Sequence, residues 1–261
     1  MVLPIEVGYK LSSDPIYEDT QLKRFATDDP YLFVETFEVP ELGQGASAPN
    51  FDRYREIYDN MRERLLNVQL QSFVPEMVDA DSDDCWAAFG VPKDLYTVSE
   101  FAKSYLGGIT GRDWAWILRR MLMVLHKARR RPSITEENML IHPEGHGLVL
   151  LGWQPVEDDQ SYPLDEILEV MQRQLKSGDD TDLQINFVEK VSERFKKNRR
   201  SPQDLKSDPQ IKLPLFGYDD VLREFEMLLE HLYGPRKFHK SKIDPALSLP
   251  YLQRESALLN S

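Results

Sequence analysis

Apolar and polar positions follow short-period patterns along the first hundred residues. Between residues 31 and 39, β-branched and aromatic side chains partly alternate with polar ones, which predicts a strand. Residues 41–50 are rich in Gly, Ala and Ser and predict a loop. From residue 51 to 69 apolar residues recur every three or four positions, as in an amphipathic helix. Three further runs predict strands, at residues 72–78, 85–89 and 95–101.

After Gly108 the pattern becomes helical. A wide apolar stripe between residues 114 and 130 predicts a long helix whose basic last turn suits the negative end of the helix dipole. Two apolar runs at residues 139–141 and 148–151 flank a turn with two glycines and predict a β-hairpin. Three more helices are expected, at residues 163–176, 182–197 and 219–233.

This order of elements predicts an α+β fold in two lobes, with strands first and helices second. Residues 1–100 form a small β-rich lobe with one long helix at about 51–69. Residues 101–108 form the hinge, and residues 109–239 form a larger helical lobe. Residues 240–261 are expected to lie on the surface as a C-terminal tail.

Composition limits the classes of function. The chain has 261 residues, 41% of them hydrophobic, and no apolar run approaches the roughly 20 residues that cross a bilayer, so no membrane contact is expected. The single cysteine, Cys85, forms no internal disulfide, and no secretory signal is recognisable, so we expect a cytoplasmic location. The net charge of −12 falls entirely on residues 1–100, which argues against nucleic-acid binding.

Four stretches of the sequence, taken in order, resemble the protein-kinase-like superfamily. Tyr-Thr-Val-Ser-Glu-Phe at residues 96–101 is similar to the last strand of the small lobe and the hinge, with Ser99, Glu100 and Phe101 as hinge residues. The helix at 114–130 is similar to the long helix before a catalytic loop. Residues 133–141 resemble that loop, and residues 147–153 resemble the strand that enters a magnesium-binding motif.

The residues that a kinase uses at the catalytic loop are replaced. The resemblance implies an aspartate five positions before Asn138, where it would accept the proton of the attacking hydroxyl, but Ser133 occupies that position. The magnesium-binding carboxylate falls at Gly152, which has no side chain. Trp153 follows it in place of the motif phenylalanine, and we hypothesise that its ring fills the space of a nucleotide.

The residues that would hold phosphate in the small lobe are also replaced. The resemblance places Glu35 where a strand lysine would pair with the phosphates, and a carboxylate there would repel them. Glu56 matches the helix glutamate that would pair with that lysine, so its partner is missing. No Gly-x-Gly-x-x-Gly cradle occurs near the N-terminus.

These departures predict a catalytically inactive kinase-like protein, a pseudokinase, that acts as a binding or scaffold module for another protein. We expect no cofactor and no metal, and nucleotide binding without metal stays an open question. Its candidate contact surfaces are the acidic lobe, the basic segment 196–200 and the tail after His239; most basic clusters, including 127–131 and 236–242, are expected to be solvated surface.

Two alternatives stay open. The first is an atypical nucleotide-binding kinase or nucleotidyl transferase, which would need replacement carboxylates near Gly152. The second is a structural component of a larger assembly. The acids available to the first alternative are Glu136, Glu137, Glu157, Asp158 and Asp159.

Overall fold

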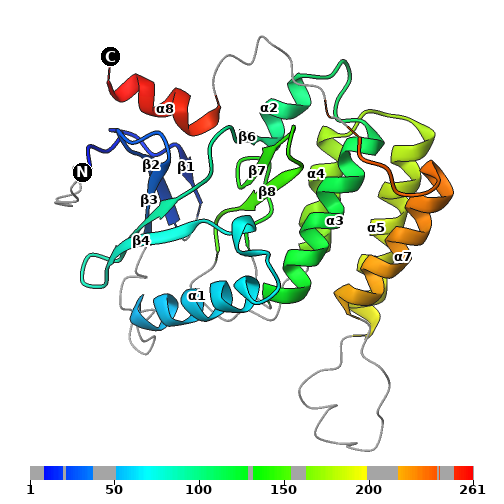
Figure 1. The fold of residues 1–261 in the computed structure, drawn as a ribbon, viewed down its shortest axis with the longest axis horizontal. Coiled ribbons are helices and arrows are strands. Elements are labelled where there is room, and N and C mark those ends of the chain that lie inside the picture. The colour runs from blue at the N-terminus through cyan, green and yellow to red at the C-terminus, as the bar shows by residue number, and fades with distance from the viewer. Residues whose placement is uncertain are drawn as a thin grey trace, which may run out of the picture.

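A small sheet lobe and a larger helical lobe make up the fold, as Figure 1 shows. The computed structural model describes residues 9–19, 22–37, 51–128, 132–153, 163–198, 217–239, 241 and 250–260. The predicted α+β class with two lobes is confirmed by the order and placement of these elements.

The small lobe is built on a five-stranded antiparallel sheet with the order β1-β2-β3-β5-β4. Its strands are β1 Tyr17–Glu18, β2 Leu22–Ala26, β3 Leu32–Phe37, β4 Glu76–Asp81 and β5 Trp86–Gly90. Helix α1, Phe51–Leu66, enters between β3 and β4, and a short 3-10 helix, η1 Gln71–Phe73, follows it. The strand predicted at residues 72–78 therefore begins later, at Glu76.

The alternation of side chains in the sheet divides the small lobe into two packed faces. On the inner face, aromatic rings of the sheet meet the tyrosines of α1: the centroids of Phe37 and Tyr54 lie 4.8 Å apart, and those of Phe89 and Tyr58 lie 5.4 Å apart. The outer face carries a second cluster around Trp86, covered by the N-terminal segment. The apolar stripe that predicted α1 is thus the stripe that the helix buries.

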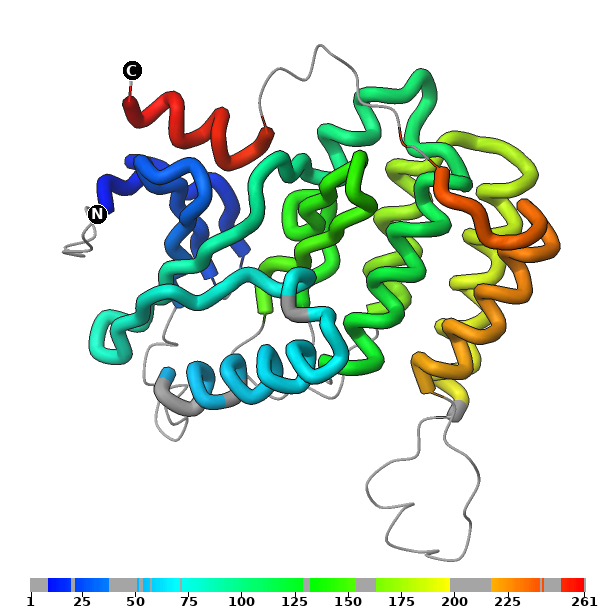
Figure 2. Tube along the Cα trace, viewed as in Figure 1, coloured from blue at the N-terminus to red at the C-terminus, as the bar shows by residue number. Residues whose placement is uncertain are grey.

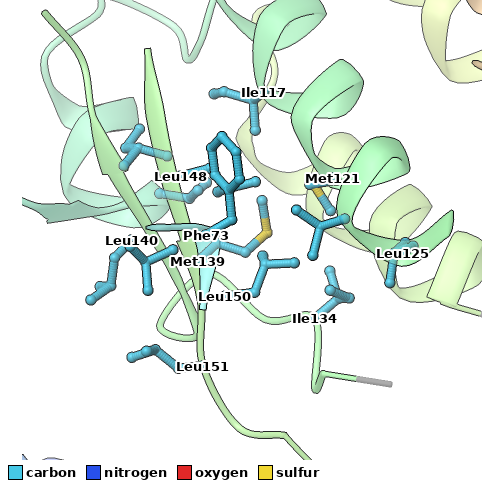
Figure 3. Packing of buried hydrophobic residues seen from close by; sticks show 14 of the residues in the cluster. Phe73, Ile117, Met121, Leu125, Ile134, Met139, Leu140, Leu148, Leu150 and Leu151 are labelled. Atoms are coloured by element: carbon cyan, nitrogen blue, oxygen red, sulfur yellow. The ribbon is translucent and has the colours of Figure 1, made fainter. Parts of the chain in front are cut away.

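The larger lobe surrounds a three-stranded sheet with the order β6-β7-β8. Its strands are β6 Tyr96–Thr97, β7 Met139–His142 and β8 Gly147–Leu150, and its helices are α2 Val98–Lys103, α3 Gly111–Ala128, α4 Pro163–Gln174, α5 Asp179–Asn198 and α7 Tyr218–Tyr233. Figure 3 shows the β7–β8 hairpin packed on α3, with Met139, Leu148 and Leu150 facing Ile117 and Met121. No helix in the described ranges is both long and apolar enough to cross a membrane.

The strand predicted at residues 95–101 is shorter than expected, and the predicted hinge residues Ser99, Glu100 and Phe101 are wrong. The strand is limited to β6, which pairs with β7 of the larger lobe, and Ser99, Glu100 and Phe101 lie on helix α2. The reason is a capping box: the Thr97 hydroxyl accepts from the Glu100 backbone N–H, and the Glu100 carboxylate accepts from the Thr97 N–H. The chain leaves the sheet after β5, so residues 91–95, rather than 101–108, connect the lobes.

The described part of the C-terminal tail contains a helix that packs on the small lobe. Helix α8, Tyr251–Leu259, lies along the N-terminal strands (Figure 2), with Tyr251 and Leu252 buried. The Tyr251 N–H donates to the Leu95 carbonyl at 3.0 Å, and Arg254 pairs with Glu100. The face of α8 that carries Tyr251 and Leu252 is therefore buried within the chain. It is unavailable to the protein partner that the sequence suggested for the tail.

Two buried tyrosines of α1 provide a matched test of the small-lobe core. Tyr58 donates to the Pro75 carbonyl at 2.7 Å, whereas the Tyr54 hydroxyl has no partner among the described residues. Tyr58→Phe should lower the free energy of unfolding by about 1–2 kcal/mol, because a buried carbonyl loses its donor. Tyr54→Phe should be neutral or stabilising, because it removes a buried unpaired hydroxyl. Urea unfolding of both variants measures the difference, and equal losses would contradict the assigned hydrogen bonds.

Candidate functional site

The residue predicted to repel phosphate belongs to a row of side chains across the sheet. Tyr17 of β1 lies opposite Arg24 of β2, and Arg24 lies opposite Glu35 of β3. Arg24 donates to one Glu35 oxygen from Nε at 2.9 Å and from Nη2 at 2.6 Å. The two side chains are fully buried, with Arg24 0% and Glu35 2% exposed.

This ion pair determines the electrostatics of the inner sheet face. Burial raises the pKa of Glu35, and the positive charge and hydrogen bonds of Arg24 oppose that rise. The guanidinium also lies 4.9 Å from the ring centre of Tyr17 and 5.1 Å from that of Phe33. Glu35 is therefore not a free repulsive charge, as the sequence suggested, but one half of an internal pair.

Glu56, predicted to be the glutamate partner of a strand lysine, is exposed on the outside of α1. It lies two residues from both Tyr54 and Tyr58, and these two tyrosines are buried against the sheet. Residues two apart on a helix point to different faces, so Glu56 is directed away from Glu35. The prediction for Glu56 is wrong for this geometric reason.

The loop predicted to resemble a catalytic loop brings Ser133, Asn138 and Gly152 together. The Ser133 N–H donates to the Gly152 carbonyl at 2.9 Å, and the Leu151 N–H donates to the Asn138 carbonyl at 2.8 Å. The Asn138 side chain is fully buried, and both atoms of its amide lack a hydrogen-bond partner within the described residues.

Gly152 is required by its conformation and by its neighbours. Its φ is +65°, in the region where residues with a Cβ are strained. A Cβ at this position would also lie 2.9 Å from Asn138 Nδ2 and 3.2 Å from the Ser133 Cβ. A carboxylate at the position that the resemblance assigns to the metal ligand would therefore be strained, and it would require the Asn138 side chain to shift.

Tyr17 joins the sheet row to this loop. Its hydroxyl donates to Asp19 at 3.0 Å. Burial raises the pKa of Tyr17, while the nearby polar side chains of Ser133 and Asn138 act in the opposite direction. The phenol therefore lies between the small lobe and the loop, where an interlobe ligand would enter.

Sequence reasoning missed Tyr17 and Arg24. The one available signal was Arg24 itself, which stands between Leu22 and Ala26 on the inward-facing positions of β2.

Trp153 is a core residue. Its ring is buried in the main hydrophobic cluster, its indole N–H donates to the Leu150 carbonyl at 2.7 Å, and its backbone pairs with Pro132. These contacts account for a large aromatic residue at this position. That its ring fills the space of a nucleotide stays a hypothesis.

Of the acids that an atypical enzyme would need, the structure describes Glu136 and Glu137. Burial would raise the pKa of Glu136, but hydrogen bonds from Arg173 and Gln174 outweigh it and lower that pKa. Glu137 is exposed. Residues 157–159 lie outside the described residues. Across the described ranges, no group of three or more His, Cys, Asp or Glu side chains could hold a metal ion.

No protein-family profile and no curated protein match the sequence. The structure is similar to vaccinia related kinase 3, with a TM-score of 0.47 and 13% identity over 93% of this chain and 91% of that one. It is also similar to the PknI kinase domain of Mycobacterium tuberculosis, with a TM-score of 0.40 and 14% identity over 97% and 95% of the two chains. A third similar structure, Cex1p, has a TM-score of 0.37 and 10% identity over 100% of this chain and 45% of that one. Since all three TM-scores lie below 0.5, these likenesses carry no statement about activity.

The buried Arg24–Glu35 pair should show strong coupling. Arg24→Met leaves a carboxylate buried without its cation, and Glu35→Leu leaves the cation, so each single change should cost about 3–5 kcal/mol of unfolding free energy. The double variant removes both charges and should recover most of that loss. A double-mutant cycle in urea measures the coupling energy, and costs that simply add would rule out a direct pair.

Restoring the kinase carboxylate should damage the fold. Gly152→Asp places a Cβ against Asn138 at a left-handed position, which should lower stability by about 1–3 kcal/mol. Gly90→Ala is the matched control, because a Cβ there meets only ordinary contacts of 3.5 Å or more. Thermal unfolding compares the two, and a Gly152→Asp variant as stable as the control would show that the loop has room for a carboxylate.

Proposed function

We propose that this chain is a kinase-like protein without phosphoryl-transfer activity that acts by binding another protein. The observation that carries the proposal is at Gly152, where the chain has no carboxylate, and where the backbone conformation and the Asn138 side chain both disfavour one. Phosphoryl transfer depends on positioning and on charge neutralisation by metal ions and cations. A cleft without that carboxylate lacks the main ligand for the metal.

The small lobe supports the same proposal from the opposite side of the cleft. The position of the phosphate-binding lysine carries Glu35, and the nearby cation, Arg24, is already paired with it inside the sheet. Freeing Arg24 for a phosphate would leave Glu35 buried and charged, at a cost of several kcal/mol. Ser133 adds no base of suitable pKa for a hydroxyl nucleophile.

The kinase-like part of the proposal is supported by the order of elements. A helix enters between the third and fourth strands of a five-stranded sheet, and a long helix, a loop and a short hairpin follow in the other lobe. The loop and hairpin bring Ser133, Asn138 and Gly152 to the side of the larger lobe that faces Tyr17.

The acidic side of the small lobe is the contact surface that we favour for the partner. Strand β4 lies at the edge of the sheet, and the turn after it exposes Asp83 and Asp84. The N–H groups of both residues donate to Asp81, which holds the turn in shape. An unpaired strand edge beside a fixed acidic turn suits a protein segment with basic residues.

Thermal unfolding with and without ATP, each with and without magnesium, tests the loss of catalysis. A ligand that binds only the native state raises the midpoint, and 100-fold excess over its dissociation constant is worth about 2.7 kcal/mol. We expect no magnesium-dependent shift. A clear one would make the atypical nucleotide-binding kinase or nucleotidyl transferase the better assignment.

The binding role is tested by a second experiment, in which the immobilised protein captures partners from an extract of its own cells. A specific partner should be retained by the wild-type chain and lost when Asp83→Lys and Asp84→Lys reverse the charge of the turn. Retention of the same partner by both chains would remove the acidic edge as the contact surface. If the retained partners are repeated subunits of a large particle, the structural-component alternative would be favoured.

A further inference from the structure

A cavity lies within the larger lobe, lined by other residues than those of the Ser133, Asn138 and Gly152 loop. It has a volume of about 650 Å³ and is formed by α3, α7, the segment 234–239 and the turn between β7 and β8. Positive side chains from three separate parts of the chain line it: Arg112, Arg119, Arg120, Arg223, Arg236 and Lys237. The only acids in this lining are Glu226 and Glu230.

The positive charges of the cavity are not balanced from within. Glu226 is fully used by Arg119, which donates to both of its oxygens from Nε and Nη2. Arg120 is half-buried, and burial together with the charges of Arg236 and Arg119 lowers its pKa. Like charges held this close favour a bound anion, because an anion relieves their repulsion.

The cavity is built by specific contacts and is not a chance arrangement of surface side chains. The ring of His146 is stacked between Trp116 and Phe238, with centroid distances of 4.5 Å on both sides. The Ser241 hydroxyl donates to the buried Asp113 carboxylate at 2.5 Å, and it accepts from the indole N–H of Trp116 at 3.2 Å. These contacts fix the segment that carries Arg236 and Lys237 against α3.

We propose that this cavity binds a phosphate-bearing ligand. A phosphate monoester carries close to two negative charges at neutral pH, and the planar guanidinium group matches its oxygens with two parallel hydrogen bonds. The cavity is larger than a phosphate, and Phe238 is 71% exposed at the end of the aromatic stack, so a planar ring attached to the phosphate has a surface to contact. The proposal uses different residues from the interlobe cleft and does not depend on the proposed function.

Calorimetric titration of the full chain with inorganic phosphate and with phenyl phosphate tests the site. Arg236→Ser with Lys237→Ser removes two exposed cations of the lining, and we expect phosphate affinity to fall about tenfold or more. Lys190→Ser with Lys197→Ser is the matched control, because it removes two exposed cations from α5, outside the lining, and should leave the affinity unchanged. Tighter binding of phenyl phosphate identifies a ring-bearing source, and equal binding identifies a compact phosphate; both support the site.

Three outcomes would overturn the proposal. One is no heat of binding with millimolar phosphate or phenyl phosphate. Another is equal affinity in the wild-type chain and the Arg236→Ser/Lys237→Ser variant. The third is an equal loss in the control pair, which would indicate a general charge effect. Repeating the ATP and magnesium experiment in the Arg236→Ser/Lys237→Ser background separates this cavity from the interlobe cleft, so each proposal can fail alone.

Discussion

The buried pair of Arg24 and Glu35 is the interaction on which the small lobe depends. Two charges in a sheet interior cost several kcal/mol of desolvation each, and they are tolerated only when they meet in good geometry. The antiparallel register places them directly opposite one another, and Nε and Nη2 of Arg24 both donate to one carboxylate oxygen of Glu35. Because the guanidinium also lies beside the Tyr17 ring, the pair orients the residue that reaches the loop of the other lobe.

This arrangement makes the positions that the resemblance assigns to a kinase site dependent on one another. With Arg24 committed to Glu35, no cation of the sheet row is left for phosphate. With Tyr17 near the loop and Asn138 buried against Gly152, a carboxylate at Gly152 would need the Asn138 side chain to shift as well. A single reverse substitution therefore meets a structural obstacle instead of restoring a function.

Local periodicity was sufficient to predict the elements that bury one continuous stripe, namely α1, α3 and the β7–β8 hairpin. It failed where a short signal decided the structure. The capping box of Thr97 and Glu100 starts a helix where the apolar run had predicted a strand. Strand β1 is too short to show an alternation of apolar and polar residues. The row of Tyr17, Arg24 and Glu35 depends on strand register. The charge of Arg236 acts on Arg120 only after α7 packs beside α3. Pairing across such distances is invisible in a single sequence.

The distribution of charge connects the two proposed surfaces. The whole net charge of −12 lies on residues 1–100, yet the cationic cavity is built from residues of the helical lobe. At physiological ionic strength the Debye length is about 8 Å, so exposed acids beyond that distance have little effect on an anion in the cavity. The local arginines decide its affinity there, while the acidic edge acts on its own surroundings. One chain can thus present an acidic surface and a cationic cavity to two different ligands. The net charge of the whole chain indicates only the acidic surface.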